Sequence, residues 1–192
     1  MDLPVSLLTA EVRVAMFVLG ALGLFAAVRR APWKRMSEGA RLNVLLGFAV
    51  ALTLMWSMKA GVKPGLNLHL LGAMAATLAL GPWLAVIALA LALCGITLNG
   101  SLGWSDWPGN LVLMVLFPVA IAFTIQHLVE RWLPAHFFVF VFVTGFAGSA
   151  LTVMAQGLTA ASVLALSGAY SAEFLWSEYL PFFLLLGFSE AW

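Results

Sequence analysis

Long apolar runs separated by short polar segments dominate this chain, and the longest runs match the length of a membrane-spanning helix. About 20 mostly apolar residues are needed to cross the hydrocarbon core of a bilayer as an α-helix. The pattern therefore predicts spanning helices over residues 12–28, 42–58, 110–126 and 137–156. Charged or polar residues follow the first three of these runs, beginning with Arg29 and Arg30 after the first.

A further apolar stretch, residues 66–98, is too long for one straight span. Gly81 and Pro82 interrupt it. A proline inside a helix removes one backbone hydrogen bond and clashes with the preceding turn. We therefore predict two short helices, over about 68–80 and 83–98, followed by a polar loop over 99–109.

The last third of the sequence is less regular. Residues 157–172 are rich in Ser, Ala and Gly and predict a short surface helix or a loop. The final apolar run over 181–192 has twelve residues. This run gives about 18 Å of helix, whereas the hydrocarbon core is about 30 Å thick. Either the helix begins near Ala172, with Glu173 and Glu178 at the interface, or the sequence stops early. We expect one transmembrane domain over residues 1–192, truncated at its C-terminal end.

Composition supports the same fold class. Hydrophobic residues make up 64% of the chain and charged residues 9%, against about 45–50% and about 25% in soluble domains. These values exclude a soluble enzyme, a disordered chain and a nucleic-acid-binding protein. The single cysteine, Cys94, excludes an internal disulfide. We predict an all-α, polytopic transmembrane bundle of six to seven helices, with short helices broken by Gly and Pro around residues 66–98.

The placement of Lys and Arg predicts the orientation, because cytoplasmic loops are enriched in positive charge. Five of the nine such residues lie between the first two helices: Arg29, Arg30, Lys34, Arg35 and Arg41. We expect this loop in the cytoplasm of a bacterium and the amino terminus outside the inner membrane. No positive charge precedes the first apolar run, so a cleavable signal peptide is not expected. The predicted outer face then collects the polar residues Met1, Asp2, Asn67, His69, Asp106 and Asn110.

Two motifs among these segments carry a family resemblance. They are Gly65-Leu-Asn-Leu-His69-Leu-Leu-Gly72 and Leu80-Gly81-Pro82-Trp83-Leu-Ala85. Together with Pro108-Gly109-Asn110 and the closing run from Pro181, they resemble the CbiM/NikM family. Members of this family are the substrate-binding membrane subunits of energy-coupling-factor ABC transporters for cobalt and nickel.

The resemblance implies a metal site at the amino terminus. In the family, the α-amine, the second backbone nitrogen and a histidine at position two bind a divalent ion with a second histidine, which matches His69. Such a set of nitrogen donors in a square plane suits Ni(II) or a similar ion. This sequence has Asp2 at position two. The carboxylate is a harder ligand, so three alternatives stay open: a weakened site, another cation, or a different solute.

Each candidate residue also has a structural interpretation. His69 and Asp2 are the candidate side-chain ligands and Met1 the amine donor, but a lone histidine near a helix start is often a packing residue. Asn67 and Asn110 would orient loops through hydrogen bonds, or would cap helices; Asn110 stands where an N-cap is wanted. Asp106 is either a supporting residue of the site or a solvated turn residue.

The predicted function is capture of cobalt or nickel as transported substrate, without a permanently bound cofactor. The sequence has no G-x-x-x-x-G-K-[ST] phosphate loop. We therefore expect a transporter subunit that is not itself an enzyme. The resemblance implies a transmembrane coupling (T) subunit and ATPase subunits as partners. The alternative from another class is a membrane scaffold or assembly subunit that has the same fold but no longer binds metal.

Overall fold

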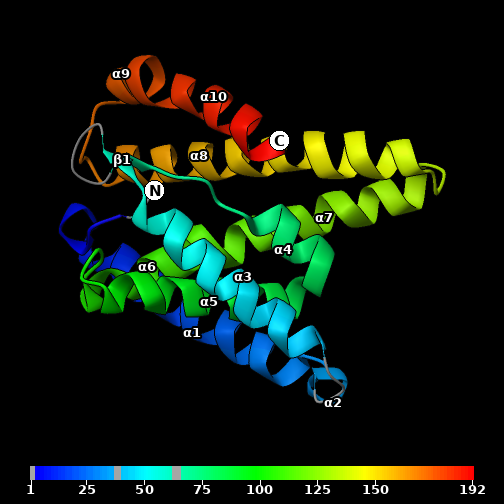
Figure 1. The fold of residues 1–192 in the computed structure, drawn as a ribbon. Helices are drawn as coiled ribbons and strands as arrows, with labels where there is room; N and C mark the ends of the chain where they lie inside the picture. Colours follow the sequence, from blue (N-terminus) through cyan, green and yellow to red (C-terminus); the bar gives the residue numbers. More distant parts are fainter. Residues whose placement is uncertain (1–2, 37–39, 62–65) are drawn as a thin grey trace.

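The computed structural model describes residues 3–36, 40–61 and 66–192. These residues form helices joined by short loops, and one two-stranded hairpin (Figure 1). The α-helices are α1 (Ala10–Arg30), α2 (Trp33–Met36), α3 (Ala40–Ser57), α4 (Ala73–Leu80), α5 (Pro82–Leu98), α6 (Trp107–Asn110), α7 (Phe117–Trp132), α8 (Gly148–Leu166), α9 (Ala172–Phe174) and α10 (Leu180–Ala191). The strands are β1 (Ala60–Gly61) and β2 (Asn67–Leu68).

Three π-helical segments make longer continuous helices out of these pieces. They are η3 (Leu111–Leu116) between α6 and α7, η4 (Val139–Ala147) before α8, and η5 (Leu175–Tyr179) between α9 and α10. Two 3-10 turns, η1 (Val5–Leu7) and η2 (Trp104–Asp106), precede α1 and α6. With these junctions counted as continuous, the described part of the chain has seven main helices, which confirms the predicted all-α bundle.

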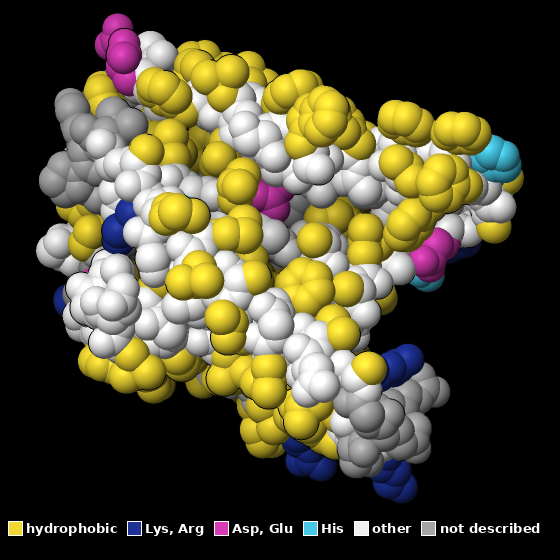
Figure 2. Space-filling view, in the orientation of Figure 1, with side chains coloured by type: hydrophobic (Ala, Val, Ile, Leu, Met, Phe, Trp, Pro, Cys, Tyr) yellow, Lys and Arg dark blue, Asp and Glu magenta, His cyan; other side chains and the backbone are white. Residues whose placement is uncertain are grey.

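Four helices are long and apolar enough to cross a membrane: Ala10–Arg30, Ala40–Ser57, Trp104–Trp132 and Val139–Leu166. Large apolar side chains are exposed along them, and Figure 2 shows such side chains spread over most of the visible face. A water-soluble protein rarely exposes such an extensive apolar surface. Lipid is therefore the natural environment of this surface.

The helices pack in two groups (Figure 1). In one group α10 packs along α8, and in the other α3 packs along α5. Helix α4 and helix α7 contact both α5 and α8, and so connect the groups. The core between them consists of Leu, Ala, Met and Val side chains with the large rings of Trp56, Tyr179 and Phe183.

The break at Gly81 and Pro82 is confirmed, but the start of the preceding helix is not the one predicted. Gly81 has a φ of 78° and Pro82 begins α5. Helix α4 begins at Ala73 rather than near residue 68, because Gly72 has a φ of 72° and ends an extended segment. An apolar composition alone does not reveal such a left-handed backbone position, which favours glycine.

Two other boundaries differ from the prediction. Residues 157–166 continue α8 instead of forming a loop or a surface helix. Their small side chains pack against α10, since a methyl group on Gly157 would lie 2.2 Å from the Phe183 ring. At the other boundary, the helix predicted from Asn110 begins upstream of that residue, in α6.

The last helix follows the first of the two alternatives given for it. It begins at Ala172, where the Ser171 hydroxyl accepts a hydrogen bond from the Phe174 N–H at 3.3 Å. Glu173 and Glu178 are exposed on it.

Candidate metal-binding site

The segment over residues 66–72 is an extended connection that carries His69 through the interior. It leaves the hairpin, where Ala60 pairs with Leu68 and Gly61 with Asn67, and crosses the molecule to α4 (Figure 1). Leu66 and Leu71 are fully buried, and His69 is 4% exposed. An extended backbone at this depth needs partners for its N–H and C=O groups, because apolar surroundings offer none.

The His69 ring has a defined orientation. Its Nδ1 atom lies 2.9 Å from the Leu70 carbonyl oxygen. A carbonyl oxygen only accepts hydrogen bonds, so Nδ1 carries the proton and the lone pair of the neutral ring is on Nε2. The ring also lies 5.5 Å from the Trp56 ring, centroid to centroid, at an angle of 43°. An Nδ1–H bonded to a carbonyl oxygen is common among histidines that bind a metal through Nε2.

Two other helices hold the backbone that follows His69. Trp56 of α3 donates its indole N–H to the Leu71 carbonyl oxygen at 3.3 Å. Glu190 of α10 accepts a hydrogen bond from the Leu71 N–H at 2.7 Å and another from the Gly72 N–H. The peptide groups of residues 71 and 72 are thus bonded from both sides of the segment.

Asn110 brings together two of the predicted regions. It is fully buried; its Oδ1 accepts from the Leu3 N–H at 2.8 Å and its Nδ2 donates to the Leu3 carbonyl at 3.1 Å. The same Nδ2 donates to the Asp106 carbonyl at 2.9 Å. Of the two roles predicted for Asn110, orienting loops through hydrogen bonds or capping a helix, the capping role is not observed, because its side chain binds a segment 107 residues away. The predicted ligands Met1 and Asp2 lie outside the described residues, directly before Leu3.

The remaining predicted residues lie at the same end of the fold. Asn67 is half-buried in β2, and Asp106 is half-buried beside α6. Lys59 donates to the Ser101 carbonyl at 2.9 Å, so the loops after α3 and α5 meet there. Within the described ranges, no group of three or more His, Cys, Asp or Glu side chains could hold a metal ion. His69 is thus the predicted ligand that the described part of the chain contributes.

Sequence reasoning did not single out Trp56, Glu190 or Gln156. Gln156 is fully buried on α8, and neither polar atom of its amide has a hydrogen-bond partner in the described structure. Glu190 could have been noticed, because an ionisable residue within an apolar helix is costly and tends to be functional. Nothing in the sequence points from Glu190 to residues 71 and 72, which are more than 100 positions away.

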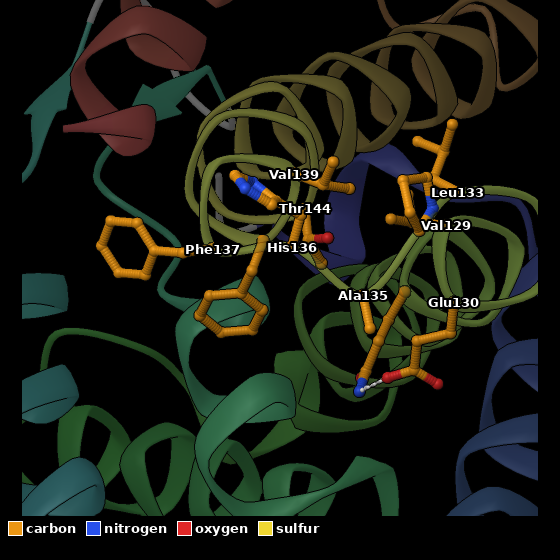
Figure 3. Close-up of a pocket in the computed structure, with 11 residues that line it drawn as sticks. Val129, Glu130, Leu133, Ala135, His136, Phe137, Val139 and Thr144 are labelled. Atoms are coloured by element: carbon orange, nitrogen blue, oxygen red, sulfur yellow. Dashed lines mark hydrogen bonds between the residues drawn. The ribbon is translucent and has the colours of Figure 1, made fainter.

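A separate pocket lies elsewhere in the described part of the chain. It has a volume of about 560 Å³ and lies in the hairpin between α7 and η4 (Figure 3). The Gln126 amide donates to the Glu130 carboxylate at 2.8 Å on one side of it. Apolar residues such as Leu133 and Val139 form much of its lining, and it contains none of the predicted ligands.

Comparison with known proteins identifies the family. Residues 2–192 match the CbiM family, described as "Cobalt uptake substrate-specific transmembrane region". The chain belongs to the CbiM family. Members of the family are transmembrane components of cobalt and transition-metal uptake that work with partner proteins.

Solved structures agree on the fold of this CbiM-family chain. One titled "Crystal Structure of an transition metal transporter" has a TM-score of 0.80 at 19% identity, over 100% of this chain and 88% of the other. A second, titled "Crystal Structure of an Truncated Transition metal Transporter", has a TM-score of 0.81 at 19% identity, with coverages of 100% and 93%. No curated protein sequence matches the chain.

Proposed function

We propose that this CbiM-family chain captures a divalent transition-metal ion, cobalt or nickel, for an energy-coupling-factor ABC transporter. The observation that carries the proposal is the buried His69 ring, whose Nδ1–H donates to the Leu70 carbonyl, so that Nε2 is the nitrogen that would bind a metal ion. Membership of a family for cobalt uptake supports the same class of substrate. The metal is substrate, and it is released rather than kept.

The proposed ligands are the Met1 amine, the Asp2 carboxylate and His69 Nε2. Asn110 anchors Leu3, and two residues extend at most about 7 Å beyond an anchored residue. Leu3, the residue that directly follows Met1 and Asp2 in the chain, is thus fixed at the buried end of α6. Asn67 and Asp106 support the site through the two loops on which they lie. With one carboxylate in place of an imidazole, this donor set is harder than one built of nitrogen atoms alone.

The proposed orientation places this site at the outer face of a bacterial inner membrane, with the segment around α2 in the cytoplasm. The basic residues between α1 and α3 support it. The sequence has no phosphate-binding loop for ATP, so energy would come from a transmembrane coupling subunit and ATPase subunits.

Calorimetric titration of the purified protein with Ni(II), Co(II) and Zn(II) tests the proposal. The protein must keep its native amino terminus, because a tag would block the α-amine. We expect binding by the wild type, loss of binding in His69→Ala, and unchanged binding in His127→Ala, whose exposed ring lies on α7. Affinity should also fall as the pH is lowered, because the amine and the imidazole must both lose their protons to bind metal.

Two results would contradict the proposed site. Binding that survives His69→Ala places the ion elsewhere. If the wild type binds none of the three ions, the alternative of a scaffold subunit without metal binding is favoured, and the replacement of the family's histidine by Asp2 would be its cause.

A further inference from the structure

Glu190 lies on the last helix, yet its carboxylate binds the backbone of the segment that carries His69. The Leu71 N–H donates to it at 2.7 Å and the Gly72 N–H donates to its other oxygen. Leu71 and Gly72 are 119 and 118 residues away in the chain. A carboxylate that accepts from two amides makes bonds roughly twice as strong as neutral ones.

These two amides would otherwise lack a partner. Gly72 is the N-cap residue of α4 and provides no side chain to cap the helix. The first N–H groups of a helix have no partner within the helix, and the helix dipole favours a negative charge there. Glu190, on a different helix, therefore binds the two amides that directly precede the first residue of α4.

The segment cannot easily shift to another position. On its opposite side the Trp56 indole donates to the Leu71 carbonyl, and the Trp56 ring contacts the His69 ring. Gly72 is packed so closely that a methyl group there would lie 2.3 Å from Leu52 Cδ2. The bonds from Glu190 act on this already confined backbone, two residues after His69.

We propose that Glu190 is a positioning residue, which fixes the direction of the His69 ring through residues 71 and 72 and links α10 to the metal site. The proposal rests on the proposed function insofar as His69 binds the transported ion. Its structural part, the hold on the His69 segment, is measurable without any metal.

Glu190→Gln is the most informative variant. Gln has the same shape but offers one acceptor oxygen, and its NH2 group would face the N–H of residue 71 or 72. The exposed Glu178 lies on the same helix, so Glu178→Gln is a matched control for loss of one negative charge. Both variants are compared with the wild-type full chain in detergent.

The first measurement is metal-free. Hydrogen exchange of the amides of residues 71 and 72 and the rate at which diethyl pyrocarbonate modifies His69 should both rise in Glu190→Gln and stay at wild-type values in Glu178→Gln. If both rates stay at wild-type values in Glu190→Gln, the proposal is overturned, whether or not the protein binds metal.

The second measurement uses Co(II) and Ni(II). Loss of a group that orients a metal-ligating histidine typically lowers metal affinity about 10–100-fold. We expect Glu190→Gln to lower the metal affinity by this factor and to shift the Co(II) ligand-field spectrum. In Glu190→Asp, the affinity and the spectrum should both return part of the way to the wild-type values. Wild-type affinity and spectrum in Glu190→Gln, despite faster exchange, would show that Glu190 holds the backbone without positioning His69. A wild type that binds no metal refutes the proposed function and leaves the first measurement to decide on Glu190.

Discussion

Asn110 is a single side chain that joins the start of the chain at Leu3 to the region around α6. Its amide makes two hydrogen bonds to the backbone of Leu3 and one to the carbonyl of Asp106, in a fully buried position. Backbone groups in apolar surroundings require such partners. The amide of Asn110 can satisfy both the N–H and the C=O of Leu3 because it contains one donor group and one acceptor.

Replacing Asn110 by Leu should destabilise the protein. Each lost hydrogen bond contributes about 0.5–1.5 kcal/mol, and a buried backbone group left without a partner costs about 1–3 kcal/mol. We expect a loss of about 2–5 kcal/mol in the free energy of unfolding, measured by denaturant unfolding in detergent. Asn99→Leu is the control, because Asn99 is exposed at the end of α5. An equal effect of the two substitutions would contradict the role of Asn110.

At this scale the sequence revealed the types of residue that matter but not their partners. His69 could be chosen because its motif resembles a family pattern and because a histidine among apolar residues is unusual. The bonds from Asn110 to Leu3 and from Glu190 to Leu71 join positions more than 100 residues apart. Local patterns contain no information about such pairs, so they could not decide between the two roles predicted for Asn110, orienting a loop or capping a helix.

Helices α8 and α10 pack closely because small residues lie between them. A methyl group on Gly157 would lie 2.2 Å from the ring of Phe183, and one on Gly187 would lie 3.3 Å from the Ala150 carbonyl oxygen. Small residues allow the backbones of membrane helices to approach each other. The position of α10, and with it that of Glu190, depends on this contact.

Gly157→Ala should therefore separate α8 from α10 and lower stability by about 1–3 kcal/mol, the usual cost of overpacking. Gly47→Ala is the control, because an added methyl group at Gly47 meets no atom within 4 Å. The stability of both variants is measured by thermal unfolding, monitored by circular dichroism. In the double variant Gly157→Ala/Phe183→Leu, the smaller side chain at position 183 should restore part of the lost stability. If Gly157→Ala is as stable as the wild type, the close contact between Gly157 and Phe183 is refuted.

The same small residues explain where the prediction of the elements failed. A Ser/Ala/Gly-rich stretch resembles a loop in a soluble protein, but in a membrane bundle residues 157–166 form a packed helix. Conversely, residues 66–72 are apolar enough for a helix and yet are extended, because partners on α3 and α10 satisfy their backbone. The long spans and the break at Gly81 were predicted correctly because they depend on local composition.

At the scale of the whole molecule, two features are consistent with each other: the exposed apolar surface and the polar loops that lie together at one end. Apolar side chains are spread over much of the visible face (Figure 2). In the polar loops, Asn110 is bonded to Leu3 and Asp106, and Lys59 is bonded to Ser101. The predicted topology placed these segments on one side of the membrane, and these bonds agree with it. The buried His69 segment runs inward from this end to α4.

The central claim is that His69 and the first residues of the chain together bind the transported ion. X-ray absorption spectroscopy of the Ni(II)- or Co(II)-loaded protein measures the ligands directly, with the native amino terminus and with His69→Ala for comparison. The account predicts a first shell of nitrogen and oxygen atoms with the outer-shell scattering of one imidazole, which disappears in His69→Ala. A shell that contains sulfur, or an imidazole signal that persists in His69→Ala, would contradict it.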